Sequence, residues 1–401
     1  MVRLVSAHGG GEETGGKRRP RGAHDIRTQA CTLLLAGTMA TLAPAAKIAA
    51  PGIATLEGRP GTAISRVDGG LSGVAFTSAR NGWAVGATDF SLATMIEHWN
   101  GTAWKLVPSP NGTARQRGPS LSRKIMPVAW LSGVAATSAA NAWAVGGHWV
   151  GDAAQSLILH WDGSKWQPVP SPSPGGSSGN TYVSAVAATS PANAWAVGEY
   201  YTGTTNRALI LHWNGRRWRQ VHSPNPGPSA GLSAVAATSA TSAWSVGSLI
   251  EHWNGTAWRR VPSPVRAMRL LGVTAPSARN AWAVGQTTAG TPLILHWNGT
   301  AWRRVPSPVR ASDSTLVSVA ALSPRDAWAV GSGPSGAIVM HWNGTTWKVT
   351  PAPGMVGGDG LADVTALSAT NAWAVGGIGA AGHRPLIEHW NGTIWQQVPN
   401  P

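Results

Sequence analysis

Seven histidines stand directly before a tryptophan at recurring intervals, and such a set of imidazoles could in principle hold a metal. They are His98, His160, His212, His252, His296, His341 and His389. Imidazole is a frequent zinc ligand, but the ligands of one ion must converge to about 2 Å from it. Each histidine here belongs to a separate copy of a repeat, so the seven should diverge. We therefore predict that they make structural hydrogen bonds, and we expect no metal site and no cofactor.

Carboxyl groups are scarce, which bears on hydrolytic chemistry. Glycoside hydrolysis needs two carboxyl groups facing one another at close range. Glu97, Glu251 and Glu388 share one repeat position and so lie in different copies. Glu199 and Tyr200 form the single acid–tyrosine neighbour pair that a sialidase-like site would need, but adjacent residues of a strand point to opposite faces. We predict no catalytic residues, and we keep an Asp-box-type glycoside hydrolase or lyase as the alternative function.

The tripeptide Asn-Gly-Thr recurs as a potential glycosylation sequon at Asn100, Asn111, Asn254, Asn298, Asn343 and Asn391. In five of the six cases, all but Asn111, the same letters join two predicted strands. Asn-Gly favours a tight hairpin turn. We interpret these five as turns first and as modification sites second.

A long internal repeat positions all of these residues. The pattern A-W-A-V-G, or a close variant, places a tryptophan at 83, 143, 195, 244, 282, 328 and 373, and each is followed by a tryptophan pair, from 99/104 to 390/395. Seven sets of three account for 21 of the 23 tryptophans. The stretch 252–267 recurs letter for letter at 296–311. Such self-similarity marks a repeat architecture and indicates a structural part rather than duplicated chemistry.

Each unit contains four short apolar or alternating runs between clusters of Gly, Pro, Ser and Asn, which predicts four antiparallel strands. Between the third and fourth strands we expect a two-residue type I′ turn at Asn-Gly, with Trp253 opposite Thr256 and residue 251 opposite Trp258. The two tryptophans would then be diagonal neighbours on one face. Seven such units predict an all-β fold, a seven-bladed β-propeller of four-stranded antiparallel blades, over residues 71–401. We expect it to be a monomer.

The repeat resembles those of BNR/Asp-box propellers, through N-A-W-A-V-G followed by L-I-L-H-W-N-G-T-A-W. It is more similar to the repeats of photosystem II stability/assembly-factor-like proteins, in which a G-W-A-V-G strand precedes a D-G-G-x-T-W hairpin; kelch propellers are a looser likeness. Gly101 and Trp104 match the end of that box, whereas Trp99 leads directly into Asn100-Gly101 without the hallmark Asp. The resemblance implies a propeller and leaves function open, because this fold carries many functions.

The N-terminal 50 residues resemble an export signal. A basic stretch, GKRRPRGAHDIRTQ, precedes the apolar run ACTLLLAGTMATLAPAA, and small residues near 46–50 offer a cleavage site. We predict a signal peptide with a basic lead at 1–50, a linker at 51–70, and a secreted or cell-envelope protein. Cys31 is the single cysteine and therefore excludes an internal disulfide.

Charge points to an acidic partner. The formal net charge is +15, and residues 71–401 carry 22 Lys/Arg against 11 Asp/Glu. Such an excess attracts acidic polymers. No basic helix or nucleic-acid-binding motif is present, so we expect no nucleic acid partner. A glycan, a peptide or an anionic envelope polymer fits better.

The candidate ligand site follows from loop variation. Antiparallel order places the connections between second and third strands and those between successive units at one end of the ring. There the stretches GHWVGDAAQS and EYYTGTTNRA contrast with Ser248 alone in the fourth unit, and variable loops on a rigid scaffold concentrate binding residues. The aromatic residues outside the repeat gather there, with polar neighbours. We predict one ligand-binding patch near the channel mouth, made of Trp130, His148, Trp149, Asp152, Tyr182, Tyr200, Tyr201 and Arg207.

Overall fold

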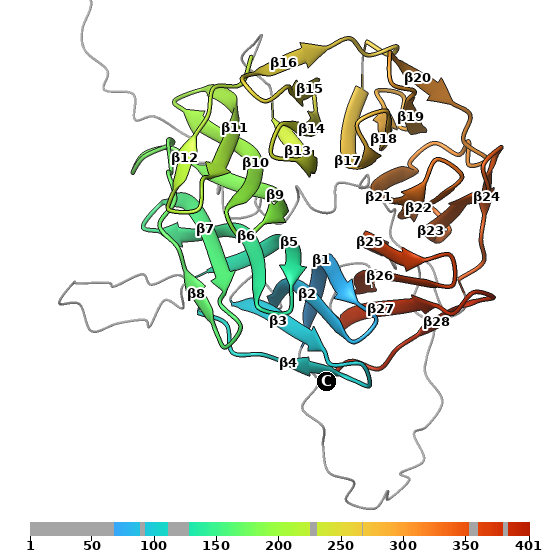
Figure 1. Cartoon of the computed structure of the whole chain (residues 1–401), viewed down its shortest axis with the longest axis horizontal. Helices are drawn as coiled ribbons and strands as arrows, with labels where there is room; N and C mark the ends of the chain where they lie inside the picture. The colour runs from blue at the N-terminus through green and yellow to red at the C-terminus, as the bar shows by residue number, and fades with distance from the viewer. Residues whose placement is uncertain are drawn as a thin grey trace, which may run out of the picture. The chain divides into compact units, whose positions relative to one another are not determined.

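The structure is a computed structural model that describes residues 68–88, 93–110, 128–224, 231–266, 268–352, 360–379 and 384–401. These residues form seven four-stranded antiparallel sheets that stand as blades around a central axis (Figure 1). The predicted all-β, seven-bladed propeller is therefore confirmed. The predicted signal peptide, most of the linker and Asn111 lie outside the described residues. In the described ranges, no helix has the length and apolar character needed to cross a membrane.

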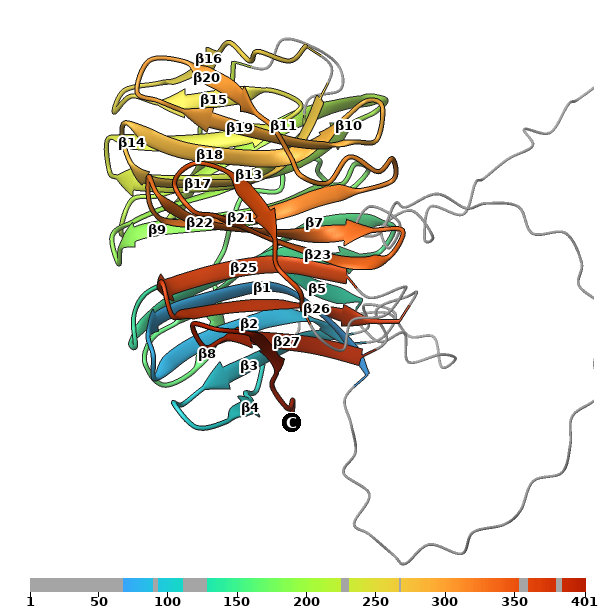
Figure 2. The ribbon, with the colours of Figure 1, turned by 90° about the vertical axis from the view of Figure 1, so that its right-hand side faces the viewer.

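The strands of each blade follow one another in the sequence, with the innermost strand first (Figures 1 and 2). Blades one to four contain β1 Gly69–Ser78, β2 Asn81–Thr88, β3 Thr94–Trp99, β4 Trp104–Leu106; β5 Ala129–Ser138, β6 Asn141–Val150, β7 Ala153–Trp161, β8 Trp166–Pro168; β9 Thr181–Ser190, β10 Asn193–Thr202, β11 Thr205–Trp213, β12 Trp218–Gln220; β13 Leu232–Ser239, β14 Ser242–Gly247, β15 Ile250–Trp253, β16 Trp258–Val261. Blades five to seven contain β17 Met268–Ser277, β18 Asn280–Thr287, β19 Pro292–Trp297, β20 Trp302–Val305; β21 Thr315–Ser323, β22 Asp326–Gly333, β23 Gly336–Trp342, β24 Trp347–Val349; β25 Gly360–Ser368, β26 Asn371–Ile378, β27 Arg384–Trp390, β28 Trp395–Gln397.

Tryptophans fill every junction between blades. In the junction of blades three and four, Trp195 of β10 lies with its ring centroid 4.9 Å from that of Trp253 and 5.2 Å from that of Trp258, the latter edge-on at 90°. The same trio recurs around the ring and closes it, because Trp373 of blade seven contacts Trp99 and Trp104 of blade one. Aromatic pairs prefer such tilted and edge-to-face arrangements. The tryptophan spacing of the sequence is therefore a packing requirement.

The hairpin between the third and fourth strands differs from the predicted type I′ turn. Trp253 pairs directly with Trp258, so the loop has four residues rather than two. Of the loop residues only Gly255 has a positive φ, of 94°. The Asn254 side chain determines this geometry: its Oδ1 accepts hydrogen bonds from the backbone N–H groups of Thr256 and Ala257, both at 3.0 Å. This local bond replaces the backbone conformation that a type I′ turn would require of Asn.

The repeated histidines make the structural hydrogen bonds that were predicted. In blade three, His212 Nε2 donates to Asn193 Oδ1 at 2.8 Å, and Asn193 Nδ2 donates to Thr189 Oγ1 at 2.7 Å. The imidazole also stacks on Trp195, with ring centroids 4.2 Å apart. The other six histidines bond the equivalent residue of their own second strand: Asn81, Asn141, Ser242, Asn280, Asp326 and Asn371.

The innermost strands approach one another so closely that they require small residues. Each contains a bulge, as between Leu71 and Gly73, at which one residue lacks a ladder partner. The residue after the bulge meets the next blade: a Cβ on Gly73 would lie 2.9 Å from Gly133 Cα. This position is Gly, Ala or Ser in six blades and Asp363 in the seventh. The exception lies where the ring closes.

Asp363 joins three blades around the axis. Its Oδ2 accepts a hydrogen bond from Val74 N of blade one at 2.9 Å, and its Oδ1 accepts one from Ser318 Oγ of blade six at 2.6 Å. None of the described strands is exchanged between the first and last blades, and there side-chain packing and this carboxyl group join the two blades. Burial raises the pKa of Asp363 to about 6, although its hydrogen bonds favour the charged form.

Asp363→Ala should therefore weaken ring closure. The substitution leaves Val74 N–H and the Ser318 hydroxyl without their acceptor, and each unsatisfied buried donor costs about 1–3 kcal/mol. We expect lower unfolding free energy in urea denaturation and faster amide hydrogen exchange in β1 and β25. Ser318→Ala removes one partner of the carboxyl group and should cost less. Equal stability of Asp363→Ala and the parent would show that packing alone closes the ring.

Candidate functional site

The variable connections of blades two and three are strands, not the loops that the sequence analysis expected. β6 and β7 pair as far as Val150 and Ala153, and β10 and β11 pair as far as Thr202 and Thr205. Each hairpin ends in a two-residue turn whose first residue is a glycine of positive φ, 61° at Gly151 and 65° in the equivalent turn of blade three. Glycine at that position is typical of a type II′ turn. The predicted binding residues therefore stand on rigid strands.

Strand alternation divides the predicted residues between two faces. Tyr200 is paired with Arg207, whereas Tyr201 is paired with Asn206, and successive side chains of a strand point to opposite faces. Tyr200 packs against the core between blades two and three. Tyr201 follows the alternation of Trp195 and so lies on the side of blade four. The eight predicted residues thus do not form one continuous surface.

Trp130, Tyr182 and Tyr201 come together in an aromatic chain. The ring centroids of Trp130 and Tyr182 are 6.0 Å apart, and those of Tyr182 and Tyr201 are 6.2 Å apart with an edge-to-face angle of 87°. Trp130 and Tyr182 occupy the second position of the innermost strands β5 and β9, which line the axis. The aromatic chain therefore lies near the axis, at the end of the ring where the innermost strands begin, and we call it, with Glu199 and Asn206, the mouth cluster.

Glu199 and Asn206, which were not among the predicted binding residues, complete this cluster. Asn206 Nδ2 donates to Glu199 Oε2 at 2.8 Å, and the Tyr201 hydroxyl donates to Glu199 Oε1 at 3.4 Å. Among the described residues, Asn206 Oδ1 is buried without a hydrogen-bond donor. Burial and the Glu199 carboxylate raise the pKa of Tyr201 to about 12 and also raise that of Tyr182. Both tyrosines therefore remain neutral at physiological pH.

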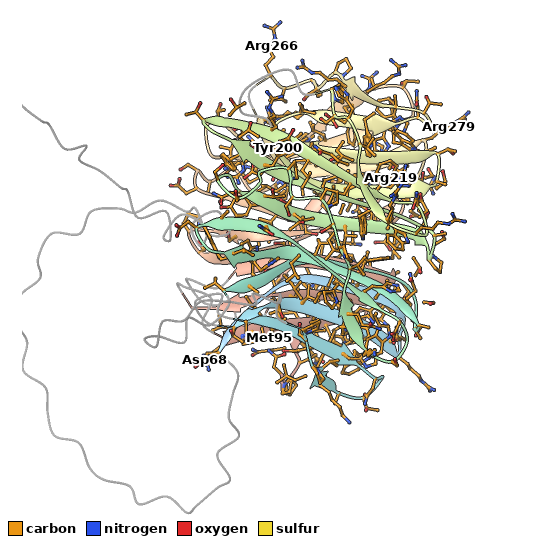
Figure 3. All side chains as sticks on the ribbon, turned by 90° about the vertical axis from the view of Figure 1, so that its left-hand side faces the viewer. Asp68, Met95, Tyr200, Arg219, Arg266 and Arg279 are labelled. Atoms are coloured by element: carbon orange, nitrogen blue, oxygen red, sulfur yellow. The ribbon has the colours of Figure 1, made fainter. Side chains whose placement is uncertain are left out.

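Tyr200 and Arg207 belong to a second feature, a hollow at the outer end of blade three (Figure 3 labels Tyr200). They line a cavity of about 340 Å³ together with Gln220, His222 and Ser223. Arg207 is exposed, and Tyr200 is half-buried. This lining supplies a cation, hydroxyl and amide groups, and one aromatic face. We call it the blade-three hollow.

The remaining predicted residues lie near the tip of the β6–β7 hairpin. His148 and Trp149 are half-buried, and Asp152 is exposed in the turn. His148 pairs with Gln155 and Trp149 with Ala154, so their side chains also point to opposite faces. Burial lowers the pKa of His148, which keeps the imidazole neutral. Within the described part of the chain, these three residues make no ring contact or ion pair with the mouth cluster.

The mouth cluster can bind but is poorly equipped to catalyse hydrolysis. The half-buried rings of Tyr182 and Tyr201, backed by the buried Trp130, can contact a sugar ring or an apolar side chain, while the half-buried Glu199 can accept hydrogen bonds from a ligand. Glu97, Glu251 and Glu388 are at most 1 % exposed and lie in three separate blades. They cannot supply the facing carboxyl groups that glycoside hydrolysis needs. No group of three or more His, Cys, Asp or Glu within the described ranges is arranged to hold a metal ion.

Comparison with solved structures identifies other propellers. A structure described as YCF48 bound to D1 peptide is 16% identical, with a TM-score of 0.51, over 84% of this chain and 99% of that one. YCF48 from Cyanidioschyzon merolae is 15% identical, with a TM-score of 0.54, over 81% and 96% of the two chains. The WD40 repeats of RRP9 reach a TM-score of 0.51 at 12% identity, over 78% and 88%.

These similarities establish the fold and agree with the resemblance drawn from the repeats. The likeness to photosystem II assembly-factor-like propellers is confirmed by the two YCF48 structures. No family model matches the chain, and no curated protein does. At 12–16% identity the neighbours describe architecture and not a shared ligand.

Proposed function

We propose that this protein is a non-catalytic binding propeller that recognises a glycan at the channel mouth. The observation that carries the proposal is the aromatic chain of Trp130, Tyr182 and Tyr201, whose two half-buried tyrosines lie beside the half-buried hydrogen-bond acceptor Glu199. A sugar residue offers an apolar face for the rings and hydroxyl donors for the carboxylate. Recognition sites commonly combine such apolar walls with a few placed polar groups.

A peptide is the second candidate ligand. One structural neighbour is described as YCF48 bound to D1 peptide, which shows that this type of scaffold can present a peptide site. A lysine, arginine or amide side chain of a peptide would also donate to Glu199. The two ligand classes differ in experiment, because only a glycan would be retained on a glycan array.

Replacement of Tyr182 and Tyr201 by alanine together should weaken binding at the mouth by roughly 30-fold, the loss typical of a recognition hot spot. The measurement is titration of the best ligand from parallel glycan and peptide arrays. Tyr200→Ala is the matched control, because Tyr200 neighbours Tyr201 in the sequence but lies on the other face of the sheet. Its affinity for the same ligand should change little.

Unchanged affinity of the double variant would remove the mouth cluster from consideration. Turnover of chromogenic glycosides by the parent protein, lost on replacement of Glu199 by glutamine, would favour the glycoside hydrolase or lyase alternative instead.

We also propose that the protein acts outside the cytoplasm, secreted or held in the cell envelope. The support is the basic lead, the apolar run and the small residues near 46–50. Mass spectrometry of the mature protein should find a new N-terminus in that interval. A full-length cytoplasmic product would contradict this localisation.

A further inference from the structure

Positive charge is concentrated in three consecutive blades. Residues 205–310, from the third strand of blade three to the segment after blade five, contain twelve arginines, no lysine and a single acidic residue, Glu251. Glu251 is 0 % exposed and so cannot neutralise the surface. The +11 excess of residues 71–401 is therefore distributed unevenly around the ring. Such one-signed surfaces raise the local concentration of an oppositely charged partner.

Seven of these arginines form one band along the outer rim of blades three, four and five. Arg219, Arg259, Arg260, Arg303 and Arg304 lie on the outermost strands β12, β16 and β20, and all are exposed. Arg266 and Arg310 follow β16 and β20 in the duplicated sequence and are also exposed. Figure 3 shows Arg266 projecting away from the outer edge of the ring. We call these seven residues the basic arc.

No carboxylate in the described part of the chain forms an ion pair with the arc. The single ion pair found among the described residues joins His341 and Asp326, in blade six. Glu251 stands opposite Arg260 in the strand ladder, but it forms no ion pair with that arginine and instead accepts a hydrogen bond from Ser223 Oγ at 2.6 Å. The arginine side chains thus retain their full capacity to bind anions.

Protection of exposed strand edges does not account for the arc. Charged residues on an edge strand do discourage pairing between molecules. The corresponding positions of blades two and seven, however, are Gln167-Pro168 and Gln396-Gln397, so the edge strands of those two blades carry no charged residue there. Arg266 and Arg310 lie beyond the ends of the edge strands. Arginine is therefore in excess of what edge protection requires.

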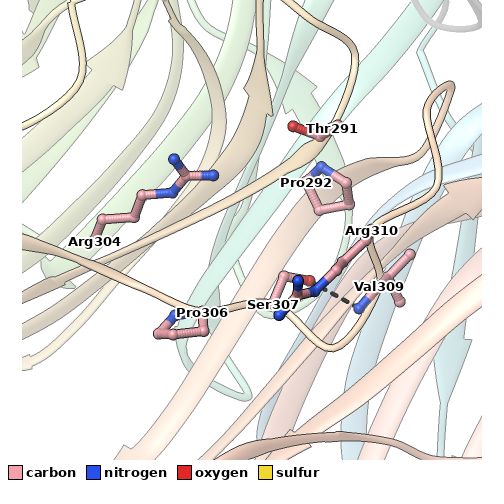
Figure 4. A pocket seen from close by; sticks show the side chains of 7 residues that line it. All are labelled: Thr291, Pro292, Arg304, Pro306, Ser307, Val309 and Arg310. Carbon is pink, nitrogen blue, oxygen red and sulfur yellow. Dashed lines mark hydrogen bonds between the residues drawn. The ribbon is translucent and has the colours of Figure 1, made fainter.

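Hollows lined by arginine occur at equivalent places in two of the three blades. In blade five, Arg304 and Arg310 border a cavity of about 420 Å³ together with Pro292 and Ser307, whose hydroxyl accepts a hydrogen bond from Val309 N at 3.2 Å (Figure 4). The blade-three hollow, with Arg207, occupies the same position of its own repeat. The blade-five hollow is thus a concave site within the arc, and the blade-three hollow lies beside it, where Gln220 follows Arg219 on β12.

We propose that the basic arc binds a linear anionic glycan that runs around the rim and crosses the edge strands of blades three to five. Its charged groups, whether carboxylates or phosphates, would be bound by guanidinium groups, which match both in bidentate geometry. A peptide is a less suitable ligand for the arc. Each edge strand belongs to one blade and has only three or four residues, so a peptide that pairs with it as a further strand would contact a single blade. This surface is distinct from the mouth cluster.

The surface favours a glycan over a nucleic acid. Single-stranded nucleic acids bind to basic grooves in which aromatic side chains stack on the bases. The exposed large apolar residues of the described chain are Leu106, Val150, Val349 and Ile394, none of which is aromatic or lies in blades three to five. The tryptophans beside the arginines are packed into the blade junctions.

The test is a fourfold substitution in the full chain, replacing Arg259, Arg260, Arg303 and Arg304 by glutamine, the residue that blade seven carries at these positions. The matched control replaces Arg80, Lys105, Arg325 and Lys348 of blades one and six by glutamine, an equal change of charge on other exposed positions. Binding is measured by surface plasmon resonance on immobilised polygalacturonate and on a poly(glycerol phosphate) glycan, at low and physiological salt. Melting temperatures establish that both variants fold.

The arc variant should lose roughly 10- to 100-fold in affinity, the product of four exposed charge interactions, and the control should lose less than about threefold. Polygalacturonate and poly(glycerol phosphate) distinguish carboxylate from phosphate as the bound charge. Equal losses in the two variants would mean that net charge alone acts and would overturn the proposal. So would tighter binding of oligo(dT) than of either glycan, or no binding of the parent at physiological salt. The arc variant should still bind the ligand of the mouth cluster, because the two surfaces share no residue. Each proposal can therefore be contradicted without affecting the other.

Discussion

Replacement of Trp258 by alanine is expected to lower the free energy of unfolding by about 3–5 kcal/mol, the cost of deleting a buried aromatic side chain. Trp258 is 4 % exposed and lies edge-on against Trp195 of the preceding blade. It also pairs across its own hairpin with Trp253. The substitution therefore opens a cavity at a junction between two blades rather than within one sheet. Relaxation of either blade into that cavity would disturb its next junction.

Urea denaturation followed by tryptophan fluorescence and far-UV circular dichroism measures this change. Trp149→Ala is a suitable control, because Trp149 is half-buried at the end of β6 and belongs to none of the seven tryptophan trios. It should cost about 1 kcal/mol or less. A Trp258→Ala variant that is as stable as the parent would show that the trio is not what holds adjacent blades together.

The fold could be predicted from the sequence because the same strand and tryptophan pattern occurs in seven copies. Every copy contributes tryptophans from three strands, and the trios that they form differ little from one junction to the next. The hairpin turn could not be predicted in detail, because a side-chain bond decides it. Asn254 Oδ1 accepts two backbone N–H groups and holds a four-residue loop, whereas the dipeptide Asn-Gly alone favours a shorter one.

Some residues of the candidate site were named from the sequence. Which of them share a face of the sheet was not predicted, because it depends on how side chains alternate along the strands. The aromatic residues were found because they lie outside the repeat. Their division between two faces depends on where the β10–β11 hairpin turns, and the turn at Gly203 was interpreted as part of a loop. With the turn at that glycine, Tyr201 pairs with Asn206 and Tyr200 with Arg207. That pairing alone would have placed Asn206 beside Tyr201 and selected Glu199, two residues earlier on the same face.

Three buried glutamates occupy a position that is Leu or Met in the other four blades. Glu97, Glu251 and Glu388 are at most 1 % exposed, and the Oε2 atom of each has no hydrogen-bond partner among the described residues. Burial raises the pKa of each to about 7, and for Glu251 the hydrogen bond from Ser223 opposes this rise. An unpaired carboxylate at a blade junction is costly, because the charged form loses its hydration there.

The sign of the resulting pH dependence follows from the protons bound. Between pH 4.5 and 7 the folded chain holds a proton on each glutamate that the unfolded chain has already released. Stability therefore falls as the pH rises through this range. Six of the repeat histidines act in the opposite direction, because burial lowers their pKa: His98, His160, His212, His252, His296 and His389. They remove stability as the pH falls below about 6.5.

Glu97→Leu should raise the free energy of unfolding at pH 8 by about 3 kcal/mol, which corresponds to a pKa raised from 4.5 to about 7. Leucine is the residue of the same position in blades two, three and five, so the junction has room for it. At pH 4.5 the glutamate is largely protonated in the fold, and the gain should become much smaller. Both proteins contain the same histidines, so the histidine contribution cancels when the free energy of unfolding of the parent is subtracted from that of Glu97→Leu.

Urea denaturation of the parent and of Glu97→Leu at pH 4.5, 6 and 8 measures this effect. Glu251→Leu serves as the comparison: Ser223 hydrogen-bonds to that carboxylate at 2.6 Å, so its removal strands a buried hydroxyl and should yield a smaller gain. A gain for Glu97→Leu that is the same at all three pH values would mean that leucine improves packing and that the glutamate carries no buried charge. A loss of stability at pH 8 would mean instead that the carboxylate is stabilised in the fold, and the pH dependence derived from its burial would then have the wrong sign.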